Sequence, residues 1–180
     1  MKIGRIEVVC GSMFSGKSEE LLRRLNRATI AKRKFQLFKP TIDDRYSKDE
    51  VVSHSGQKMV CVPLSKANQI LEFVEHDTQI VAIDEAQFYD SSLIPTVLEL
   101  TRRGKRVIIA GLDMDSNGMP FGPIPQLLAM AEEVVKLTAV CEVCGEPATH
   151  TYRKSNQNSQ VLVGAVDHYE ARCREHWDGL

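Results

Sequence analysis

Residues 11–18 read GSMFSGKS, which is a glycine, four further residues, and then glycine, lysine and serine. This spacing is typical of a loop whose backbone N–H groups point inward at the phosphates of a nucleotide. The helix after such a loop presents its positive end to the phosphates, Lys17 reaches the β- and γ-phosphates, and the Ser18 hydroxyl can ligate magnesium. The same spacing also arises by chance as an ordinary glycine turn, so the flanking sequence has to decide between the two.

The flanking sequence has the strand and the helix that a phosphate-binding loop requires. Residues 5–10 (RIEVVC) are short, apolar and β-branched, which predicts a buried strand leading into the loop. After Lys17, apolar residues recur at helical spacing, while arginines project from the other faces. The apolar positions are Leu21, Leu22, Leu25 and Ala28. This context favours a nucleotide site over a coincidental turn.

Two carboxylates follow a second apolar run. Residues 80–83 (IVAI) lead directly into Asp84 and Glu85, at the end of a strand where open α/β sheets bind their ligands. Asp84 has the position of a carboxylate that holds magnesium, directly or through water. Glu85 could orient water in an ATPase, or accept the proton of an attacking hydroxyl group in a kinase. Alternatively, both residues only cap the segment that follows.

Strand and helix patterns alternate over most of the chain. Further strands are expected at residues 35–39, 59–63, 79–84 and 106–112, and helices at 66–75, 92–103 and 125–133. This order predicts an α/β fold of the P-loop (RecA-like) class, in which helices flank a mostly parallel sheet. Residues 46–58 are polar and contain glycine, which indicates a long loop or an exposed hairpin.

Cysteine spacing indicates a metal site near the C-terminus. Cys141 and Cys144 form CEVC, and Cys173 and His176 form CREH. Three thiolates and one imidazole suffice for a closed tetrahedral zinc site, which has no open position for catalysis. Its role would be to stabilise a subdomain too small to bury a core of its own. A redox pair at Cys141 and Cys144 is the alternative, but it leaves Cys173 and His176 unexplained.

The chain changes character near Val140, where helical periodicity ends. Residues 155–160 (SNQNSQ) are polar and contain no core-forming residue. We therefore expect a P-loop ATP-binding domain at residues 1–140 and a small zinc-binding subdomain at residues 141–180. Cys10 and Cys61 lie alone in apolar stretches and are expected to be small buried side chains.

Composition narrows the class of protein. The chain has 180 residues, of which 43% are hydrophobic and 26% charged, as expected for one main globular domain. No apolar run approaches the roughly 18 residues that span a membrane, and residues 1–5 do not resemble a leader, so a cytoplasmic location without membrane contact is expected. A formal net charge of -1 argues against nucleic acid as the main partner.

Taken together, these segments closely resemble the type II thymidine kinases, a family of zinc-containing deoxynucleoside kinases. The resemblance extends over nearly the whole length. It rests on GSMFSGKS (11–18), FKPTIDDRYS (38–47), SHSG (53–56), IDEAQF (83–88), GLDMD (111–115) followed by PFG (120–122), KLTAVCEVCG (136–145) and VGAVDHYEARCREH (163–176).

The resemblance implies a role for each matching residue near the phosphates. Glu85 would be the general base that takes the proton from the 5'-hydroxyl of thymidine as it attacks the γ-phosphate of ATP. Arg45 would approach the transferring phosphoryl group together with Lys17, and Ser18 and Asp84 would hold Mg2+. The ATP-binding residues would be Gly11, Ser12, Met13, Phe14, Ser15, Gly16, Lys17, Ser18, Asp84, Glu85, Ala86 and Gln87.

The nucleoside site is implied in the same way. Tyr169 would close over the nucleoside, and a lasso segment would bind the base edge through its backbone. The lasso comprises Gln160, Val161, Leu162, Val163 and Gly164. The other substrate-binding residues would be Met13, Asp43, Phe88, Leu112, Ser116, Phe121 and Thr151. At two positions the chain departs from the family: Ser12 stands where proline is usual, and Ser116 where an aromatic residue is common.

The family also implies thymidine and deoxyuridine as substrates of nucleotide salvage, a homotetramer, and dTTP as a feedback inhibitor. Two other functions fit a P-loop with a zinc site. One is an ATPase whose zinc element grips nucleic acid, and the other is a regulatory nucleotide-binding module without catalysis. Formation of dTMP and ADP from thymidine and ATP would distinguish the kinase from both.

Overall fold

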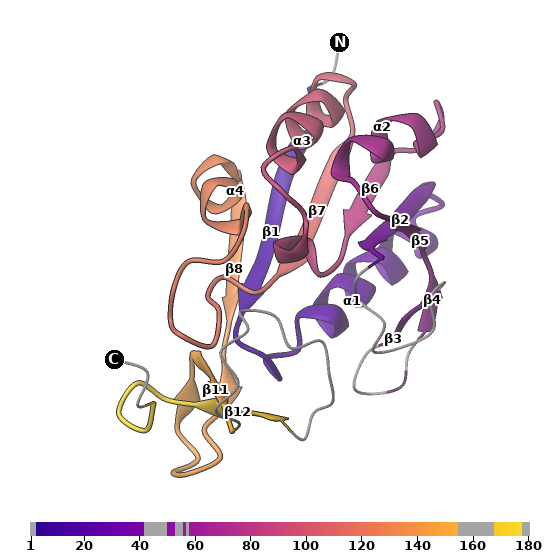
Figure 1. Ribbon diagram of the computed structural model, residues 1–180. Helices are drawn as coiled ribbons and strands as arrows, with labels where there is room; N and C mark the ends of the chain where they lie inside the picture. The colour runs from indigo at the N-terminus through magenta and orange to yellow at the C-terminus, as the bar shows by residue number, and fades with distance from the viewer. Residues whose placement is uncertain (1–2, 42–49, 53–55, 57, 155–167, 178–180) are drawn as a thin grey trace.

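The computed structural model describes residues 3–41, 50–52, 56, 58–154 and 168–177. Its centre is a sheet of six parallel strands in the order β5-β2-β6-β7-β1-β8 (Figure 1). The strands are β1 (Arg5–Gly11), β2 (Phe35–Pro40), β5 (Val62–Leu64), β6 (Ile80–Ile83), β7 (Arg106–Gly111) and β8 (Glu133–Leu137). The predicted parallel sheet is confirmed.

Helices cover both faces of this sheet. Helix α1 (Lys17–Ile30) packs on one face, and α2 (Ile70–Phe73), α3 (Leu93–Arg102) and α4 (Ile124–Met130) pack on the other. Neighbouring residues of one strand belong to opposite faces: Val8 of β1 packs with α3 and α4, whereas Val9 packs with α1. Among the described residues, no helix is both long and apolar enough to cross a membrane.

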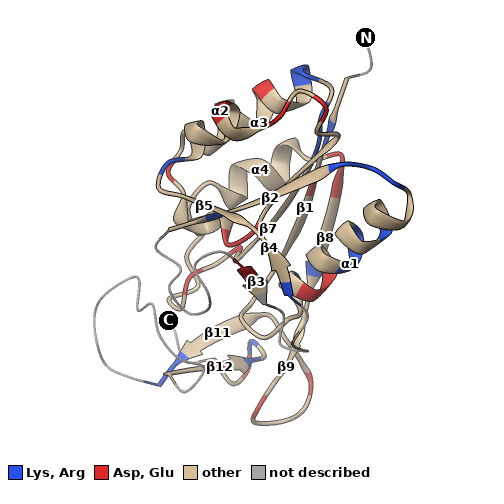
Figure 2. Ribbon diagram, turned by 90° about the vertical axis from the view of Figure 1, so that its right-hand side faces the viewer, with Lys and Arg blue, Asp and Glu red and all other residues tan. Residues whose placement is uncertain are grey.

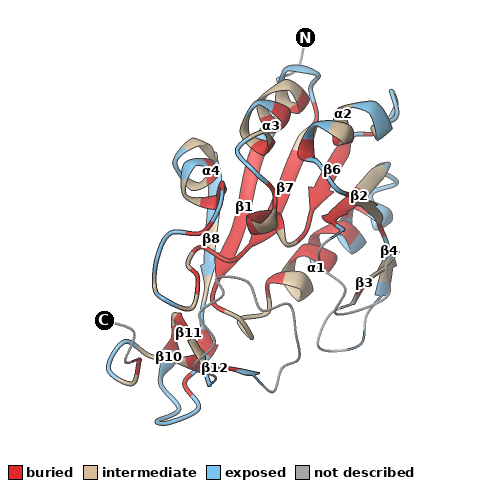
Figure 3. Cartoon of the chain, in the orientation of Figure 1, coloured by how far each residue is buried: buried red, intermediate tan, exposed pale blue. Residues whose placement is uncertain are grey.

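The central strands are buried along nearly their whole length, as Figure 3 shows for β1, β6 and β7. All four residues of β6 are buried, and the same holds for five of the six residues of β7. Strands covered by helices on both faces read as continuous apolar runs rather than as alternating ones. The IVAI run therefore becomes a strand that ends, at its carboxyl end, next to Asp84 and Glu85.

Three expected elements differ in their bounds. The strand expected at 59–63 is two strands: β4 (Lys58–Val60) pairs antiparallel with β3 (Glu50–Val52), and β5 joins the main sheet. The buried Cys61 between them marks the change of partner. The helix expected at 66–75 is reduced to η1 (Ala67–Gln69) and α2.

The helix expected at 125–133 also ends early, at Met130, and the chain turns into β8 beside β1. Glu133 is the first residue of that strand, and the β-branched Val134 and Val135 follow it. Pairing with β1 gives the backbone N–H and C=O groups of this extended segment their hydrogen-bond partners. The helical spacing of its apolar residues did not indicate this pairing.

The C-terminal part consists of two small antiparallel sheets. One pairs β9 (Ala139–Val140) with β10 (Pro147–Ala148), and the other pairs β11 (His150–Arg153) with β12 (Tyr169–Arg172). These sheets lie beyond the carboxyl ends of the main strands, below the sheet in Figure 1. The division into domains at residues 1–140 and 141–180 stays a prediction.

Candidate functional site

The loop at residues 11–18 joins β1 to α1 at the carboxyl end of the sheet. The Lys17 side chain folds back over the loop, and its Nζ donates a hydrogen bond of 2.7 Å to the Ser12 carbonyl. The Ser15 hydroxyl donates to the same carbonyl at 2.8 Å. Phe14 (φ 65) and Gly16 (φ 84) adopt left-handed conformations that turn the chain sharply into the helix. The loop is therefore compact, with the lysine ammonium held at the start of α1.

Gly11 is required by the backbone at the entrance to this loop. Its φ is 146, and a Cβ at this position would lie only 2.4 Å from the Leu137 carbonyl oxygen and 2.8 Å from the Ser15 Oγ. Leu137 ends β8, so the loop passes directly against the neighbouring strand. No side chain larger than hydrogen fits there.

Asp84 and Glu85 face this loop from the end of β6. The Ser18 hydroxyl donates to Asp84 Oδ2 at 3.1 Å, and the Glu85 N–H donates to Asp84 Oδ1 at 3.0 Å. Glu85 adopts a left-handed conformation with φ 50 and ψ 37, which costs a non-glycine residue about 1–2 kcal/mol. Strain of this kind is concentrated at functional sites. Ser18 and Asp84 thus form a pair of oxygen ligands suited to magnesium.

Gln87 connects Glu85 to the next strand. Its Nε2 donates to Glu85 Oε2 at 2.5 Å, and its Oε1 accepts the Leu112 N–H at 3.0 Å. The chain is packed tightly on both sides of it. A Cβ on Gly111 would lie 2.8 Å from Gln87 Oε1, and a Cβ on Gly122 would lie 2.3 Å from the Gln87 carbonyl oxygen. The buried amide therefore fixes the Glu85 carboxylate relative to residues 111–122.

A pocket of about 60 Å³ lies between the loop and Glu85. It brings together groups from the phosphate loop, the end of β6 and the end of β7. Its lining consists of Met13, Phe14, Gly16, Lys17, Ser18, Glu19, Glu85 and Leu112. An ammonium group, a hydroxyl group and a carboxylate thus share one small space, which is what positioning of a phosphoryl group and a nucleophile requires.

Two aromatic rings adjoin this site. Phe88 and Phe121 meet edge to face, with ring centroids 5.8 Å apart and an interplanar angle of 87°. Phe121 is held by its N–H, which donates to the Asp113 carbonyl at 3.1 Å. Leu112, whose N–H bonds to Gln87 next to Phe88, is a third apolar residue in this region. Apolar side chains of this kind could accept a flat base. Ser116 lies in the turn between Leu112 and Phe121 and is half-buried.

The phosphate loop also contacts the C-terminal sheets. The Met13 N–H donates to Thr151 Oγ1 at 3.0 Å, and the Ser12 hydroxyl donates to the Ala148 carbonyl at 3.4 Å. Tyr169 lies opposite Arg153 in the β11–β12 pair, and its hydroxyl accepts a hydrogen bond of 3.2 Å from Arg153 Nη2. Thr151 and Tyr169 therefore belong to a unit that rests on the phosphate loop, although neither lines the small pocket.

The cysteine and histidine cluster is assembled as the spacing predicts. One ligand atom from each of Cys141, Cys144, Cys173 and His176 lies within 4.8 Å of every other. The Cys144 and Cys173 sulfurs are 3.8 Å apart, which matches the edge of about 3.8 Å in a tetrahedral thiolate site with bonds of about 2.3 Å. This Cys3His group could hold zinc.

One thiol of the cluster already favours the thiolate form that a metal needs. Burial opposes ionisation of Cys141, but hydrogen bonds from the backbone N–H groups of Cys173, Cys144 and Val143 lower the pKa of its thiol to about 6. None of these three cysteines forms a disulfide with another described residue. The alternative of a redox pair fits poorly because Cys173 and His176 complete the same group.

The structure covers most of the residues singled out from the sequence, and their roles stay predictions. Gly11 to Ser18, Asp84 to Phe88, Leu112, Phe121, Thr151 and Tyr169 lie at or beside the carboxyl end of the sheet. Asp43, Arg45 and the segment from Gln160 to Gly164 lie outside the described residues.

Sequence reasoning missed two links around the site. Trp177 stacks on His150 at 4.6 Å between ring centroids, and a Cβ on Gly118 would lie 2.5 Å from the Trp177 ring. The Lys136 ammonium contacts the buried Asp113 carboxylate at 2.6 Å. The Trp177 contact joins the C-terminal unit to Gly118, and the Lys136 contact joins β8, the strand before that unit, to Asp113. That Trp177 is the only tryptophan of the chain was the one available signal.

Comparison with known families agrees with this geometry. The model of the family described as thymidine kinase matches residues 4–177, which is nearly the whole chain. The matched range includes the phosphate loop, the carboxylates after β6 and the Cys3His group.

Proposed function

The chain belongs to the thymidine kinase family, and from this premise we propose that it transfers the γ-phosphate of ATP to the 5'-hydroxyl of thymidine, giving dTMP and ADP. The observation that carries the proposal is the shared pocket in which Lys17, Ser18 and Glu85 meet. A phosphate donor needs the first two residues, and a hydroxyl acceptor needs the third.

The phosphate loop would bind the triphosphate. Backbone N–H groups and the N-terminus of α1 supply partial positive charge, and the Lys17 ammonium would exchange the Ser12 carbonyl for phosphate oxygens. Ser18 and Asp84 would hold Mg2+, since their oxygens are already 3.1 Å apart. The metal supplies charge neutralisation at the β- and γ-phosphates.

Glu85 would act as the general base. As the 5'-oxygen of thymidine forms its bond to the γ-phosphorus, the bond from that phosphorus to the bridging oxygen of ADP breaks, and the hydroxyl proton moves to the Glu85 carboxylate. The Gln87 amide donates to one oxygen of this carboxylate and so holds its orientation at the pocket. From the family resemblance, Arg45 would neutralise the transferring group, and Asp43 would lie nearby.

The nucleoside would lie between the sheet and the C-terminal unit. Phe88, Phe121 and Leu112 offer an apolar wall from the sheet side. Thr151 and Tyr169 approach from the zinc side, and the lasso from Gln160 to Gly164 would bind the base edge. Zinc held by the Cys3His group would keep this lid folded. From the family resemblance, deoxyuridine would be a second substrate. Ser116, which stands where an aromatic residue is common, would admit a wider set of nucleosides.

The remaining proposals rest on the family resemblance alone. They are inhibition by dTTP, a homotetramer, and a role in nucleotide salvage in the cytoplasm. Sedimentation velocity measures the number of chains in the assembly and so tests the homotetramer. Titration of activity with dTTP tests the inhibition.

A coupled ADP-release assay tests the proposed activity. Purified protein with ATP and Mg2+ is supplied with thymidine, deoxyuridine, deoxycytidine or single-stranded DNA, and dTMP is identified by mass spectrometry. We expect ADP and dTMP in equal amounts with thymidine, and no stimulation by DNA. ADP release that DNA stimulates and thymidine does not would replace the kinase with an ATPase.

A further inference from the structure

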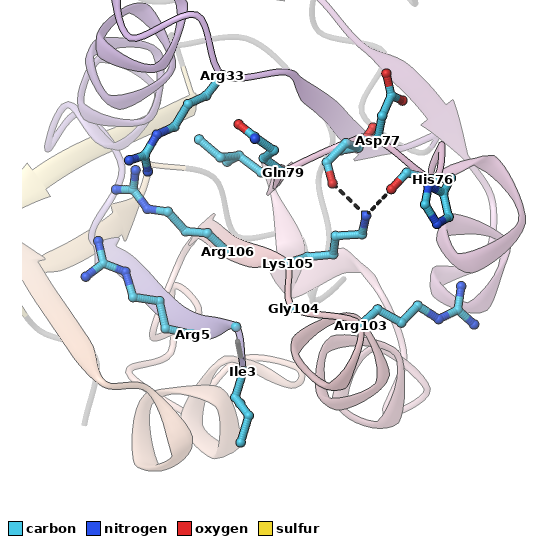
Figure 4. Close-up of a pocket in the computed structure, with 13 residues that line it drawn as sticks. Ile3, Arg5, Arg33, His76, Asp77, Gln79, Arg103, Gly104, Lys105 and Arg106 are labelled. Atoms are coloured by element: carbon cyan, nitrogen blue, oxygen red, sulfur yellow. Dashed lines mark hydrogen bonds between the residues drawn. The ribbon is translucent and has the colours of Figure 1, made fainter. Parts of the chain in front are cut away.

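A second cavity lies at the opposite end of the sheet from the phosphate loop (Figure 4). Its volume is about 630 Å³, within the range of roughly 300–1,000 Å³ that is usual for small-molecule sites. The strands β1, β6 and β7 begin here, and the segments that follow α1 and α3 complete its walls. The proposed kinase chemistry makes no use of this end of the molecule.

Positive charge is concentrated in this cavity although the chain as a whole has a net charge of -1. Five cationic side chains line it against one carboxylate, Asp77. The cations are Arg5, Arg33, Arg103, Lys105 and Arg106. The buried Glu7 carboxylate contacts two of them, Arg5 and Arg106, each at 2.6 Å. Glu99 pairs with a third cation, Arg103, at 2.9 Å. Counting these three carboxylates still leaves an excess of two positive charges.

The ends of α1 and α3 do not account for this excess. Both helices end at the cavity, and each C-terminus carries about half a negative charge. Two helix ends therefore offset only about one of the two positive charges. The remainder faces a concave surface, where low-dielectric walls strengthen its attraction for anions.

Three guanidinium groups lie in a row along one side of the cavity, in the order Arg33, Arg106 and Arg5 (Figure 4). Arg33 is directed there by the end of α1: Lys32 takes a left-handed conformation with φ 54, and the Arg33 N–H bonds to the Ala28 carbonyl at 2.9 Å. Within the described residues, the Arg33 side chain makes no hydrogen bond or ion pair. Basic residues 32–34 form the connection from α1 to β2 in Figure 2.

The other side of the cavity is rigid and polar. The Lys105 ammonium is buried and donates to the carbonyls of His76 and Thr78 at 2.7 and 2.6 Å. These bonds fix the rim where residues 76–79 turn into β6. The Gln79 amide lies at the centre of the cavity in Figure 4, between the guanidinium row and this rim.

We propose that this cavity binds an oligophosphate chain, inorganic or carried by a nucleotide, whose oxygens contact Arg33, Arg106 and Arg5. Guanidinium groups match phosphate oxygens through paired N–H donors, and several in a row suit a chain of phosphates better than a single ion. The site is distinct from the phosphate loop and does not depend on the proposed kinase activity.

Titration calorimetry in phosphate-free buffer without magnesium tests this site. The full chain carries Lys17→Ala, which weakens the phosphate loop, and is titrated with sodium triphosphate and, separately, with ATP. We expect one site per chain, weakened about 10-fold or more by Arg33→Glu, because a charge-assisted contact is lost and a repulsive one is gained. The matched control is Arg102→Glu, which makes the same charge change on α3 outside the cavity.

The location of binding is checked by hydrogen exchange. Triphosphate should protect the amides of residues 76–80 and 103–106 in the Lys17→Ala chain, and Arg33→Glu should remove this protection. Equal affinity for triphosphate and ATP would identify the phosphate chain as the ligand, and tighter binding of ATP would identify a nucleotide. The proposal is wrong if the Lys17→Ala chain binds neither ligand, or if Arg33→Glu and Arg102→Glu weaken binding equally.

Discussion

The phosphate-binding sheet and the C-terminal unit meet at one site but are stabilised in different ways. Two large apolar clusters, one on each face, hold the six-stranded sheet and its helices. Among the described residues, the buried cluster of the C-terminal unit consists of Ala139, Cys141, Ala148 and Ala171, with Phe14 and Cys173 packed against it. Three alanines remove little apolar surface from water, and zinc held by the Cys3His group would supply the stability that this small core lacks.

The proposed function would use this difference by placing the reacting groups on the sheet and the nucleoside lid on the smaller unit. Chemistry that needs fixed distances lies on the sheet, where Gln87 and Asp84 hold Glu85. In the proposed function the small unit would hold the nucleoside against the sheet, and its small buried cluster would allow it to change around a substrate. The contacts from Ser12 and Met13 to Ala148 and Thr151 join the two.

Removal of the metal should have the largest effect, because it should unfold the C-terminal unit and leave the sheet folded. With zinc taken out by a chelator, or with Cys144→Ser, we expect residues 141–177 to lose their fold, because structural zinc contributes about 10 kcal/mol or more to small domains. The sheet should stay folded. Zinc analysis with limited proteolysis measures both, and Cys61→Ala, a buried cysteine of the sheet, is the control. A metal-free unit that resists protease would contradict the structural role of zinc.

Glu85→Gln should separate chemistry from folding on the sheet side. The amide cannot accept the hydroxyl proton, so turnover should fall roughly 100-fold or more, the usual size of a general-base contribution. ATP binding, zinc content and thermal stability should change little. Single-turnover kinetics with thymidine measures the effect, and Glu72→Gln on the exposed side of α2 is the matched control. Turnover within a few-fold of the unsubstituted chain would remove Glu85 from the reaction.

Glu20→Gln should give the smallest effect, confined to the stability of the sheet. Hydrogen bonds from Arg23 and Arg24 lower the pKa of Glu20 to about 2, against the partial burial that raises it. A lowered pKa stabilises the fold above about pH 4.5, and this contribution is lost as the pH falls toward 2. We expect the unfolding free energy to drop by about 1 kcal/mol at pH 7, after allowing for solvent screening.

Urea unfolding at pH 7, 5 and 3.5 follows this prediction. The difference in unfolding free energy between Glu20→Gln and the unsubstituted chain should be largest at pH 7 and smaller at pH 3.5. Glu99→Gln, which removes an exposed carboxylate from an ion pair on α3, should have a weaker effect. A difference that grows as the pH falls would show that Glu20 does not stabilise the fold as its carboxylate.

The same contrast explains what the sequence could predict. GSMFSGKS and IVAIDE predicted a phosphate loop and carboxylates at adjacent strand ends, because spacing along the chain fixes their places in a parallel sheet. CEVC and CREH predicted a Cys3His group, because ligand chemistry restricts which residues can meet. Both the sheet and the cluster are confirmed.

Other features depend on contacts between distant segments, which local patterns do not record. Glu133 was predicted in a helix because its neighbours have helical spacing, yet pairing with β1 makes it a strand. Nothing local indicates that Gln87 reaches Leu112, or that Arg33 lies beside Arg106. The second cavity was therefore invisible until strand beginnings and helix ends came together.

The Gln87 amide has a consequence for how substrate preference can change. It is bonded at once to the Glu85 carboxylate and to the backbone of Leu112, which borders the apolar wall. A mutation that shifts residues 111–122 to admit a different base would also displace the carboxylate. In the proposed site, substitutions in residues 111–122 that favour a new nucleoside would therefore lower the rate of phosphoryl transfer before selectivity improves. Substitutions on the Tyr169 side would leave the contacts of Gln87 with Glu85 and Leu112 intact.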